Sequence, residues 1–241
     1  MKISVEHIEN TCPESEIYNT ELALDGKHIL ELGCGPADLT RAIATEGQDR
    51  QITALEVDKI QHAKNEKITD LPNVCFKLAG AQAIPEADNT FDIVFMFKSL
   101  HHVPLDLMEK GFAEIHRVLK PGGYAYISEP IFAGDFNEIL RLFNDEQEVR
   151  AAAFEATKAA VNSGLFQLCK QIFFNTPIAF ENFEDFEKKV LQATHTEFNL
   201  SPELHARIKE KFSQYAGKDG ARFNMPMRVD LLQKPANNTT S

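Results

Sequence analysis

The sequence ILELGCGPADLTRAIA, residues 29–44, decides the fold class of this chain. It begins as a short apolar strand, turns sharply at Gly33-Cys34-Gly35, and continues with Leu39, Ala42 and Ile43 at helical spacing. Glycines at a strand end let the backbone approach a ligand closely, and the N-terminus of the following helix favours negative groups. This order of strand, glycine turn and helix indicates an α/β sheet with a ligand at the turn.

Four further strands are predicted downstream, and helices separate them. The predicted strand ranges are 51–56, 74–78, 91–97 and 124–128. A helix at 59–67 follows the first of them, and another, ending near residue 119, precedes the last. This alternation predicts a doubly wound, mostly parallel sheet of the Rossmann-like type over residues 1–130. In such sheets ligands bind at the carboxyl ends of the strands.

Residues 131–241 differ in composition, since they hold 13 of the 18 phenylalanines. Their pattern predicts mostly helix, with Ser201 as the N-cap of one helix and the polar stretch 144–148 as a solvated helix face. A final antiparallel strand, at about 227–233, is expected to return to the core sheet. We therefore expect a helical cap and substrate region. Most of its phenylalanines form a core or a homodimer face, and a few line an acceptor pocket.

The composition excludes some classes of partner. The formal charge is -11, which disfavours a nucleic-acid-binding face because phosphate backbones are also negative. The longest purely apolar run, Ile93–Phe97, is far too short to span a bilayer, and the first residues carry no signal-like apolar stretch. Four cysteines without C-x-x-C spacing fit reduced thiols. These features predict a cytoplasmic protein without membrane or nucleic-acid partners.

Four motifs together resemble the class I S-adenosylmethionine (SAM)-dependent methyltransferases of the small-molecule type. They are ILELGCGPADLTRAIA at 29–44, ITALEVD at 52–58, NTFDIVFMFKSLHHVP at 89–104 and EIHRVLKPGGYAYISEP at 114–130. The resemblance covers roughly residues 28–130, in the order and spacing of the family. It implies that residues 1–130 bind SAM as the cofactor and release S-adenosylhomocysteine (SAH) as the product.

The resemblance also implies roles for individual residues. Glu31 is expected to hold the methionine amino group, Glu56 the ribose hydroxyls, and the Phe97 carbonyl the methionine ammonium; Asp58 is interpreted as a helix cap. The expected cofactor-binding residues are Glu31, Gly33, Cys34, Gly35, Glu56, Gly80, Ala81, Gln82, Phe97 and Lys98.

One position departs from the family pattern. Many relatives have an aspartate after the third strand that accepts a hydrogen bond from the adenine amino group. Gly80 stands at that position here, so we expect adenine to rely on the Ala81 backbone N–H or on the Gln82 side chain.

A nicotinamide dinucleotide is the rival cofactor for such a glycine turn. Its fingerprint requires a third glycine where this chain has Asp38. A carboxylate at that place would face a pyrophosphate, which is electrostatically unfavourable. SAM carries no phosphate, so the sequence favours SAM.

Methyl transfer requires alignment, and a general base only when the acceptor arrives protonated. The predicted catalytic pair is His101, after the fourth strand, with Glu129, at the end of the fifth. Lys98, Arg228 and His195 are further candidates for contact with the acceptor. The remaining histidines show no metal-ligand spacing, so no catalytic metal is predicted.

The sequence thus predicts an enzyme that methylates oxygen or nitrogen of a small molecule with an apolar or aromatic body. A carbon acceptor stays open. The alternatives are a non-catalytic SAM-binding sensor or partner subunit, and a protein methyltransferase.

Overall fold

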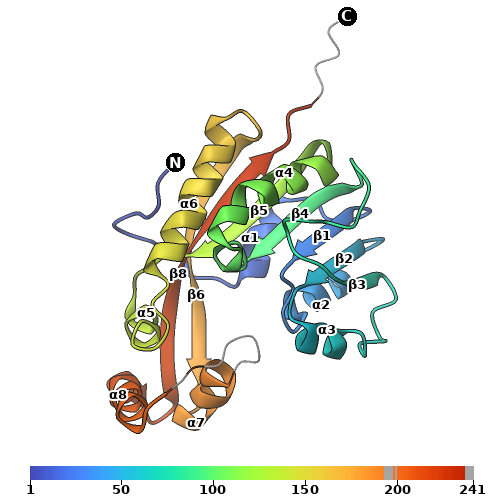
Figure 1. Ribbon diagram of the computed structural model, residues 1–241. Helices are drawn as coiled ribbons and strands as arrows, with labels where there is room; N and C mark the ends of the chain where they lie inside the picture. The colour runs from blue at the N-terminus through green and yellow to red at the C-terminus, as the bar shows by residue number, and fades with distance from the viewer. Residues whose placement is uncertain (193–197, 199, 237–241) are drawn as a thin grey trace, which may run out of the picture.

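The computed structural model describes residues 1–192, 198 and 200–236, and its centre is one eight-stranded mixed sheet (Figure 1). The strand order is β3-β2-β1-β4-β5-β8-β6, with β7 paired to β8. The strands are β1 His28–Leu32, β2 Gln51–Glu56, β3 Val74–Leu78, β4 Phe91–Phe97, β5 Leu119–Pro130, β6 Gln167–Phe180, β7 Ala216–Gly217 and β8 Gly220–Gln233. The helices are α1 Glu14–Glu21, α2 Asp38–Thr45, α3 Lys59–Asn65, α4 Met108–Val118, α5 Asp135–Leu140, α6 Gln147–Asn162, α7 Phe183–Phe186 and α8 Pro202–Ser213, with short turns η1 Leu100–His102, η2 Leu105–Leu107 and η3 Glu187–Leu191.

The first five strands run parallel, and the strand order reverses between β1 and β4. β1 pairs with β2 on one side and with β4 on the other, and β3 and β5 extend the sheet outward. The carboxyl ends of these strands therefore meet at one edge, next to the switch point where such sheets bind ligands. The doubly wound, mostly parallel sheet predicted from the sequence is confirmed.

Helices cover both faces of the sheet (Figure 1). On one face, α4 and α6 pack through residues such as Phe112 and Ala153. On the other face, α1 and α2 pack through Tyr18 and Ile43. Strand β4 is buried at nearly every position, as expected for a central parallel strand. No helix among the described residues combines the length and apolar character needed to cross a bilayer.

Strands β6 and β8 form a long antiparallel pair, called the hairpin below although α7, α8 and β7 lie between them in the chain. The sequence analysis missed β6 and the first part of β8. The final strand does pair antiparallel with β5, but it begins at Gly220 rather than near residue 227. Residues 167–180 form β6, so the expectation of helix is wrong there. Most β6 side chains are half-buried or exposed, and regular apolar alternation is absent. The division into 1–130 and 131–241 stays a prediction.

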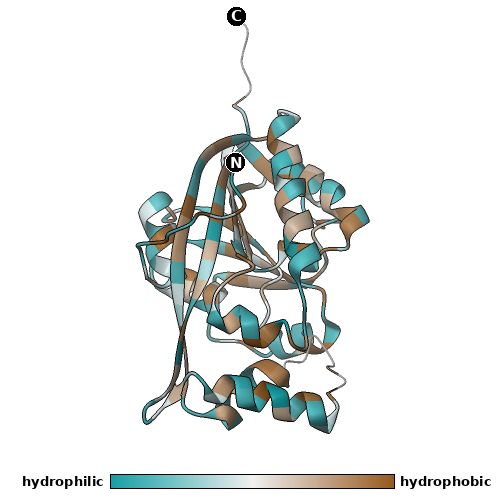
Figure 2. Cartoon of the chain, turned by 90° about the vertical axis from the view of Figure 1, so that its left-hand side faces the viewer, coloured by the Kyte–Doolittle hydropathy of each residue, from teal (hydrophilic) through white to brown (hydrophobic). Residues whose placement is uncertain are grey.

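A separate phenylalanine-rich core surrounds the far half of this hairpin, where it extends beyond the central sheet to α7 and α8 (Figure 2). Ring centroids of neighbouring pairs lie 5.3 Å apart for Phe180 and Phe186 and 5.2 Å apart for Phe186 and Phe212. Ser201 caps α8 through a hydrogen bond from the Leu204 N–H at 3.2 Å, as its sequence predicts. These phenylalanines pack against one another and form a core, as expected from the sequence for most of the phenylalanines in residues 131–241.

Candidate active site

The glycine turn joins β1 to α2 at the switch point. The Gly33 and Cys34 N–H groups both donate to the Leu55 carbonyl, at 2.9 and 3.0 Å. Gly33 and Gly35 have left-handed φ angles of 74° and 51°, which glycine adopts at little cost. A Cβ on Gly33 would lie 2.7 Å from Ser99 Cβ, whereas one on Gly35 would meet no protein atom within 4 Å. Packing therefore requires Gly33, while Gly35 borders open space.

Two buried carboxylates flank this turn. Glu31 in β1 is 2% exposed, and Glu56 at the end of β2 is 7% exposed. Burial raises the pKa of Glu31 to about 7; the hydrogen bond from Thr40 Oγ1, at 2.6 Å, opposes this rise, and the charge of Glu56 adds to it. A cationic group at the turn would stabilise the ionised form of both carboxylates.

The Glu56 carboxylate also holds the local backbone. Oε2 accepts a hydrogen bond from the Gly35 N–H at 2.8 Å, and Oε1 accepts from the N–H groups of Val57 at 2.7 Å and Asp58 at 2.8 Å. Asp58 is a helix cap, as interpreted from the sequence, because its Oδ1 accepts from the Ile60 N–H at 2.8 Å. Glu56 thus fixes the glycine turn against the end of β2, and its contact with ribose stays a prediction.

The turn after β3 holds the residues expected beside adenine. Its backbone closes through a hydrogen bond from the Ala83 N–H to the Gly80 carbonyl at 3.1 Å. The Gln82 amide packs against Gly80 so closely that a Cβ on Gly80 would lie 2.4 Å from Gln82 Oε1. Ala81 is buried. Gln82 therefore takes the space that a side chain at position 80 would occupy, and it brings a polar group there.

His101 and Glu129 meet at the neighbouring ends of β4 and β5. His101 lies in η1, and its Nδ1–H donates to Glu129 Oε2. Glu129 Oε1 accepts a hydrogen bond from the Leu100 N–H at 2.9 Å, so both oxygens of the carboxylate hold the ring and its turn. The two side chains are 3% and 2% exposed. A histidine held in this way presents Nε2 as a proton acceptor.

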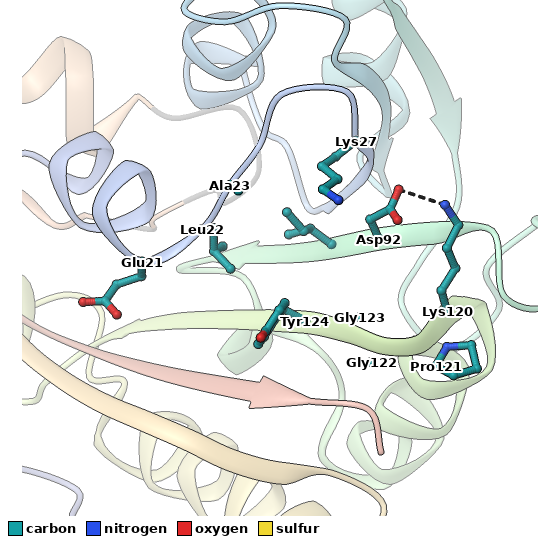
Figure 3. Close-up of a pocket in the computed structure, with 11 residues that line it drawn as sticks. Glu21, Leu22, Ala23, Lys27, Asp92, Lys120, Pro121, Gly122, Gly123 and Tyr124 are labelled. Atoms are coloured by element: carbon teal, nitrogen blue, oxygen red, sulfur yellow. Dashed lines mark hydrogen bonds and ion pairs between the residues drawn. The ribbon is translucent and has the colours of Figure 1, made fainter. Parts of the chain in front are cut away.

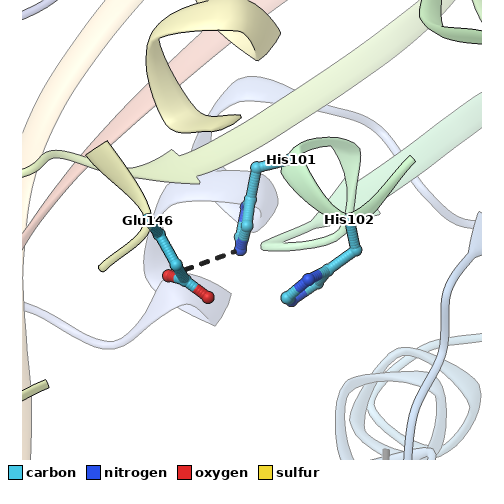
Figure 4. Close-up of side chains that lie close together, drawn as sticks. All are labelled: His101, His102 and Glu146. Atoms are coloured by element: carbon cyan, nitrogen blue, oxygen red, sulfur yellow. Dashed lines mark ion pairs between the residues drawn. The ribbon is translucent and has the colours of Figure 1, made fainter. Parts of the chain in front are cut away.

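A second carboxylate, Glu146, reaches the same histidine from the N-cap of α6. Figure 4 shows His101, His102 and Glu146 pointing toward one another, and one ligand-type atom of each lies within 4.8 Å of the others. His101 Nε2 lies 3.8 Å from Glu146 Oε2, and the Glu146 side chain is 13% exposed. The expectation that 144–148 is a solvated helix face is therefore wrong for Glu146. Sequence spacing could not predict that Glu146 lies near His101, because only the tertiary fold places the start of α6 beside η1.

Arg150 holds Glu146 in place. Its Nη2 and Nε donate to Glu146 Oε2 at 2.6 and 3.0 Å, and its Nη1 donates to Asn137 Oδ1 at 3.1 Å. Burial would raise the pKa of Glu146, but the neighbouring His101 and Arg150 lower it below its usual value. The guanidinium of Arg150 thus forms an ion pair with the Glu146 carboxylate, which also lies beside the two imidazole rings of Figure 4.

Lys98 lies at the carboxyl end of β4, directly after the buried Phe97. Lys98 is exposed and has a left-handed φ of 52°, and its N–H donates to the Ser128 carbonyl at 2.7 Å. Nearby, Glu14 of α1 is 6% exposed and accepts a hydrogen bond from Tyr126 Oη at 2.8 Å. Burial raises the pKa of Glu14, and the charge of Lys98 opposes that rise. The sequence analysis missed Glu14 because only the packing of α1 brings it to this edge.

Arg228 belongs to the hairpin. It is 2% exposed, its Nε donates to Asp230 Oδ2 at 2.8 Å, and its guanidinium carbon lies 4.6 Å from the centroid of the Phe154 ring. These contacts leave it as a structural residue. His195 lies outside the described residues.

A cavity of about 360 Å³ lies at the opposite, amino-terminal edge of the strands, where Lys120 pairs with Asp92 (Figure 3). A smaller cavity of about 210 Å³ lies by the amino ends of β2 and β3. Neither is lined by the glycine turn. The candidate active site is thus the carboxyl edge itself, covered on one side by the start of α6.

Comparison with known proteins relates the chain to methyltransferases. Residues 29–123 match the model of a family described as methyltransferase domain. Over 125 residues the chain is 33% identical to a ubiquinone/menaquinone biosynthesis C-methyltransferase of Psychromonas ingrahamii, a match that covers 50% of this chain and 48% of that protein. The chain therefore spans about half the length of the curated relatives it matches.

Two solved structures extend the likeness to most of the chain. A SAM-dependent methyltransferase from Methanosarcina mazei has a TM-score of 0.59 at 16% identity, over 94% of this chain and all of that one. The [4+2]-cyclase SpnF has a TM-score of 0.58 at 20% identity, over 92% of this chain and 80% of that one. At such identities the likeness shows the fold alone.

Proposed function

We propose that this chain, which belongs to the class I SAM-dependent methyltransferases, transfers a methyl group from SAM to oxygen or nitrogen of a small-molecule acceptor. The observation that carries the proposal is the pair of buried carboxylates at the glycine turn, Glu31 and Glu56, on the same strand edge as His101. SAM bears an ammonium and a sulfonium cation, which two carboxylates favour. A pyrophosphate in the same place would be repelled.

Exposed apolar side chains at the ends of β2 and β3 support the binding of a flat base. Val57 and Ile60 are each 63% exposed, and Leu78 is 46% exposed. An adenine ring on this surface would cover them and remove their apolar area from water. We place the adenine there, with the Gln82 amide replacing the acidic side chain that position 80 lacks.

The chain's own residues would accept the acceptor proton and orient the group that accepts it. SAM, when bound, supplies a methyl carbon bonded to a positively charged sulfur. His101 Nε2 would take the acceptor proton, while Glu129 holds the ring through Nδ1. The half-buried Phe132 ring, 6.0 Å from the Arg150 guanidinium carbon, supports an acceptor with an apolar body beside this base.

The proposal is tested by incubating the protein with methyl-labelled SAM and a metabolite extract. Label in small molecules is expected, with SAH formed in equal amount. Label in proteins instead would favour a protein methyltransferase. Binding of SAM with no transfer to any pool would favour the sensor.

A second candidate is transfer to a carbon atom of a quinone-type ring. The observation that favours it is the likeness of half of this chain to the Psychromonas relative, a C-methyltransferase of quinone biosynthesis. The position of the label in the product, determined by NMR, distinguishes a carbon-bound methyl group from an oxygen- or nitrogen-bound one.

Replacing Gly35 by alanine is expected to weaken SAH binding at least about tenfold. The added methyl group would project into the open space in front of the turn, where the cofactor is placed. Gly26→Ala is the matched control, because Gly26 has a similar φ of 69° and open space but lies before β1 at the opposite edge. Calorimetry that found both variants binding SAH like the unchanged protein would contradict this placement.

The affinity for SAH is expected to fall as the pH is lowered from 8 to 6. The pKa of Glu31 is about 7 in the free protein, so acid neutralises the carboxylate that attracts the ligand ammonium. The loss should approach about tenfold per pH unit below that pKa. Calorimetry near pH 7 in buffers of different ionisation enthalpy should show proton release on binding. Glu31→Gln should bind weakly and without this pH dependence; an unchanged dependence in that variant would exclude Glu31 as its source.

A further inference from the structure

We propose that Glu146 is a positioning residue for the His101 base, whose carboxylate faces the ring nitrogen left open by Glu129 and favours the imidazolium formed during transfer. This inference rests on the proposed function, in which His101 takes the acceptor proton. It assigns a role to a residue 45 positions further along the chain, on a different element.

The geometry gives the two carboxylates different tasks. Glu129 is bonded to Nδ1, which fixes the ring and leaves Nε2 as the nitrogen that can accept a proton. Glu146 Oε2 lies 3.8 Å from Nε2. This distance is too long for a hydrogen bond but short enough for a strong electrostatic interaction. Glu146 therefore does not occupy the lone pair of Nε2 with a hydrogen bond, and it acts on the ring through the electric field of its carboxylate.

The reaction would create a positive charge on a nearly buried ring. The bond between the proton and the acceptor's oxygen or nitrogen breaks and its electron pair attacks the methyl carbon. The methyl–sulfur bond breaks with its pair left on sulfur, and the proton stays on Nε2. The resulting imidazolium belongs to a side chain that is 3% exposed, and a buried cation is costly unless carboxylates face it.

Titratable groups from three elements surround the ring. Glu129 faces it from β5, His102 from η1 at a ring-centroid distance of 4.1 Å, and Glu146 from the start of α6. Arg150 of α6 offsets part of the charge of Glu146, and Lys98 lies exposed three residues before His101. The effects of Glu146 and Arg150 on His101 should therefore have opposite signs.

The same contacts tie the base to the segment that covers it. Arg150 donates to Asn137 Oδ1 in α5 and, at 3.4 Å, to the Ile131 carbonyl just after β5. Glu146 Oε1 accepts from Asn144 Nδ2 at 2.8 Å. The carboxylate is held from both sides, so it keeps its distance to Nε2 without a bond to it.

The test is an NMR titration of ¹⁵N-histidine-labelled protein saturated with SAH, with the His101 signal assigned from His101→Gln. Glu146→Gln should lower the His101 pKa by about one unit, which is a tenfold loss of proton affinity. Arg150→Gln should raise it. Glu146→Asp keeps the charge and should retain most of the effect. Glu148→Gln, which removes an exposed carboxylate from the same helix turn, is the matched control and should leave the titration unchanged.

His101 pKa changes of opposite sign in Glu146→Gln and Arg150→Gln cannot arise from a general loosening of the fold. If Glu146→Gln is unstable, the titrations of Arg150→Gln and Glu146→Asp test the proposal in its place. An unmoved His101 titration in Glu146→Gln, or equal shifts in it and in Glu148→Gln, would overturn the proposal. So would Co²⁺ absorption bands that disappear in Glu146→Gln, because the cluster would then be a cation site. Failure of the unchanged protein to bind SAH would instead overturn the proposed function.

Discussion

Replacing His101 by alanine is expected to lower methyl transfer by roughly 10²–10⁴-fold while leaving the affinity for SAH nearly unchanged. The ring is the proposed proton acceptor at this edge, and its loss leaves the buried Glu129 without its histidine partner. In the part of the chain that the structure describes, the ring has no hydrogen bond or ion pair to the glycine turn or its two carboxylates, so cofactor binding should survive. Turnover with labelled SAM and calorimetry with SAH measure the two effects separately.

Two further variants sharpen this result. Glu129→Gln keeps the shape of the pair but presents an amide to Nδ1, so it should lower turnover without abolishing it. His28→Ala removes an exposed histidine at the amino end of β1 and should act like the unchanged protein. Unchanged turnover in His101→Ala would leave alignment as the main source of catalysis and would assign His101 to packing.

The first half of the fold was predictable because its signals are local. β1, the glycine turn and α2 are contiguous over 28–45, and β4 is a single apolar run. β6 had no such signal, since its side chains are held by β8, which lies about 50 residues later in the chain, and few of them are fully buried. A strand of this kind is specified by its partner rather than by its own periodicity.

The same distinction applies to the candidate site. His101 and Glu129 follow predicted strands, and neighbouring parallel strands place their ends at one edge. Glu146 and Glu14 come from helices whose packing on the sheet no local pattern reports. The sequence could therefore indicate one carboxylate for the histidine, but the second required the fold.

Replacing Arg228 by methionine is expected to destabilise the protein by about 3–5 kcal/mol. Asp230 is fully buried, and without Arg228 its carboxylate would keep, among the described residues, one side-chain hydrogen bond, from Gln171 Nε2 at 2.7 Å. Urea unfolding without ligand measures this loss. A loss below about 1 kcal/mol would contradict it, because unpairing a buried charge costs more than that.

The double variant Arg228→Met with Asp230→Leu should lose much less stability than Arg228→Met alone, since it removes both charges from the buried hairpin. It also separates structure from function. The sequence left Arg228 as a candidate for contact with the acceptor, whereas its guanidinium is enclosed by Asp230 and Phe154. A folded double variant should therefore transfer methyl groups at nearly the unchanged rate. A folded double variant that binds SAH but turns over acceptors poorly would return Arg228 to the acceptor site.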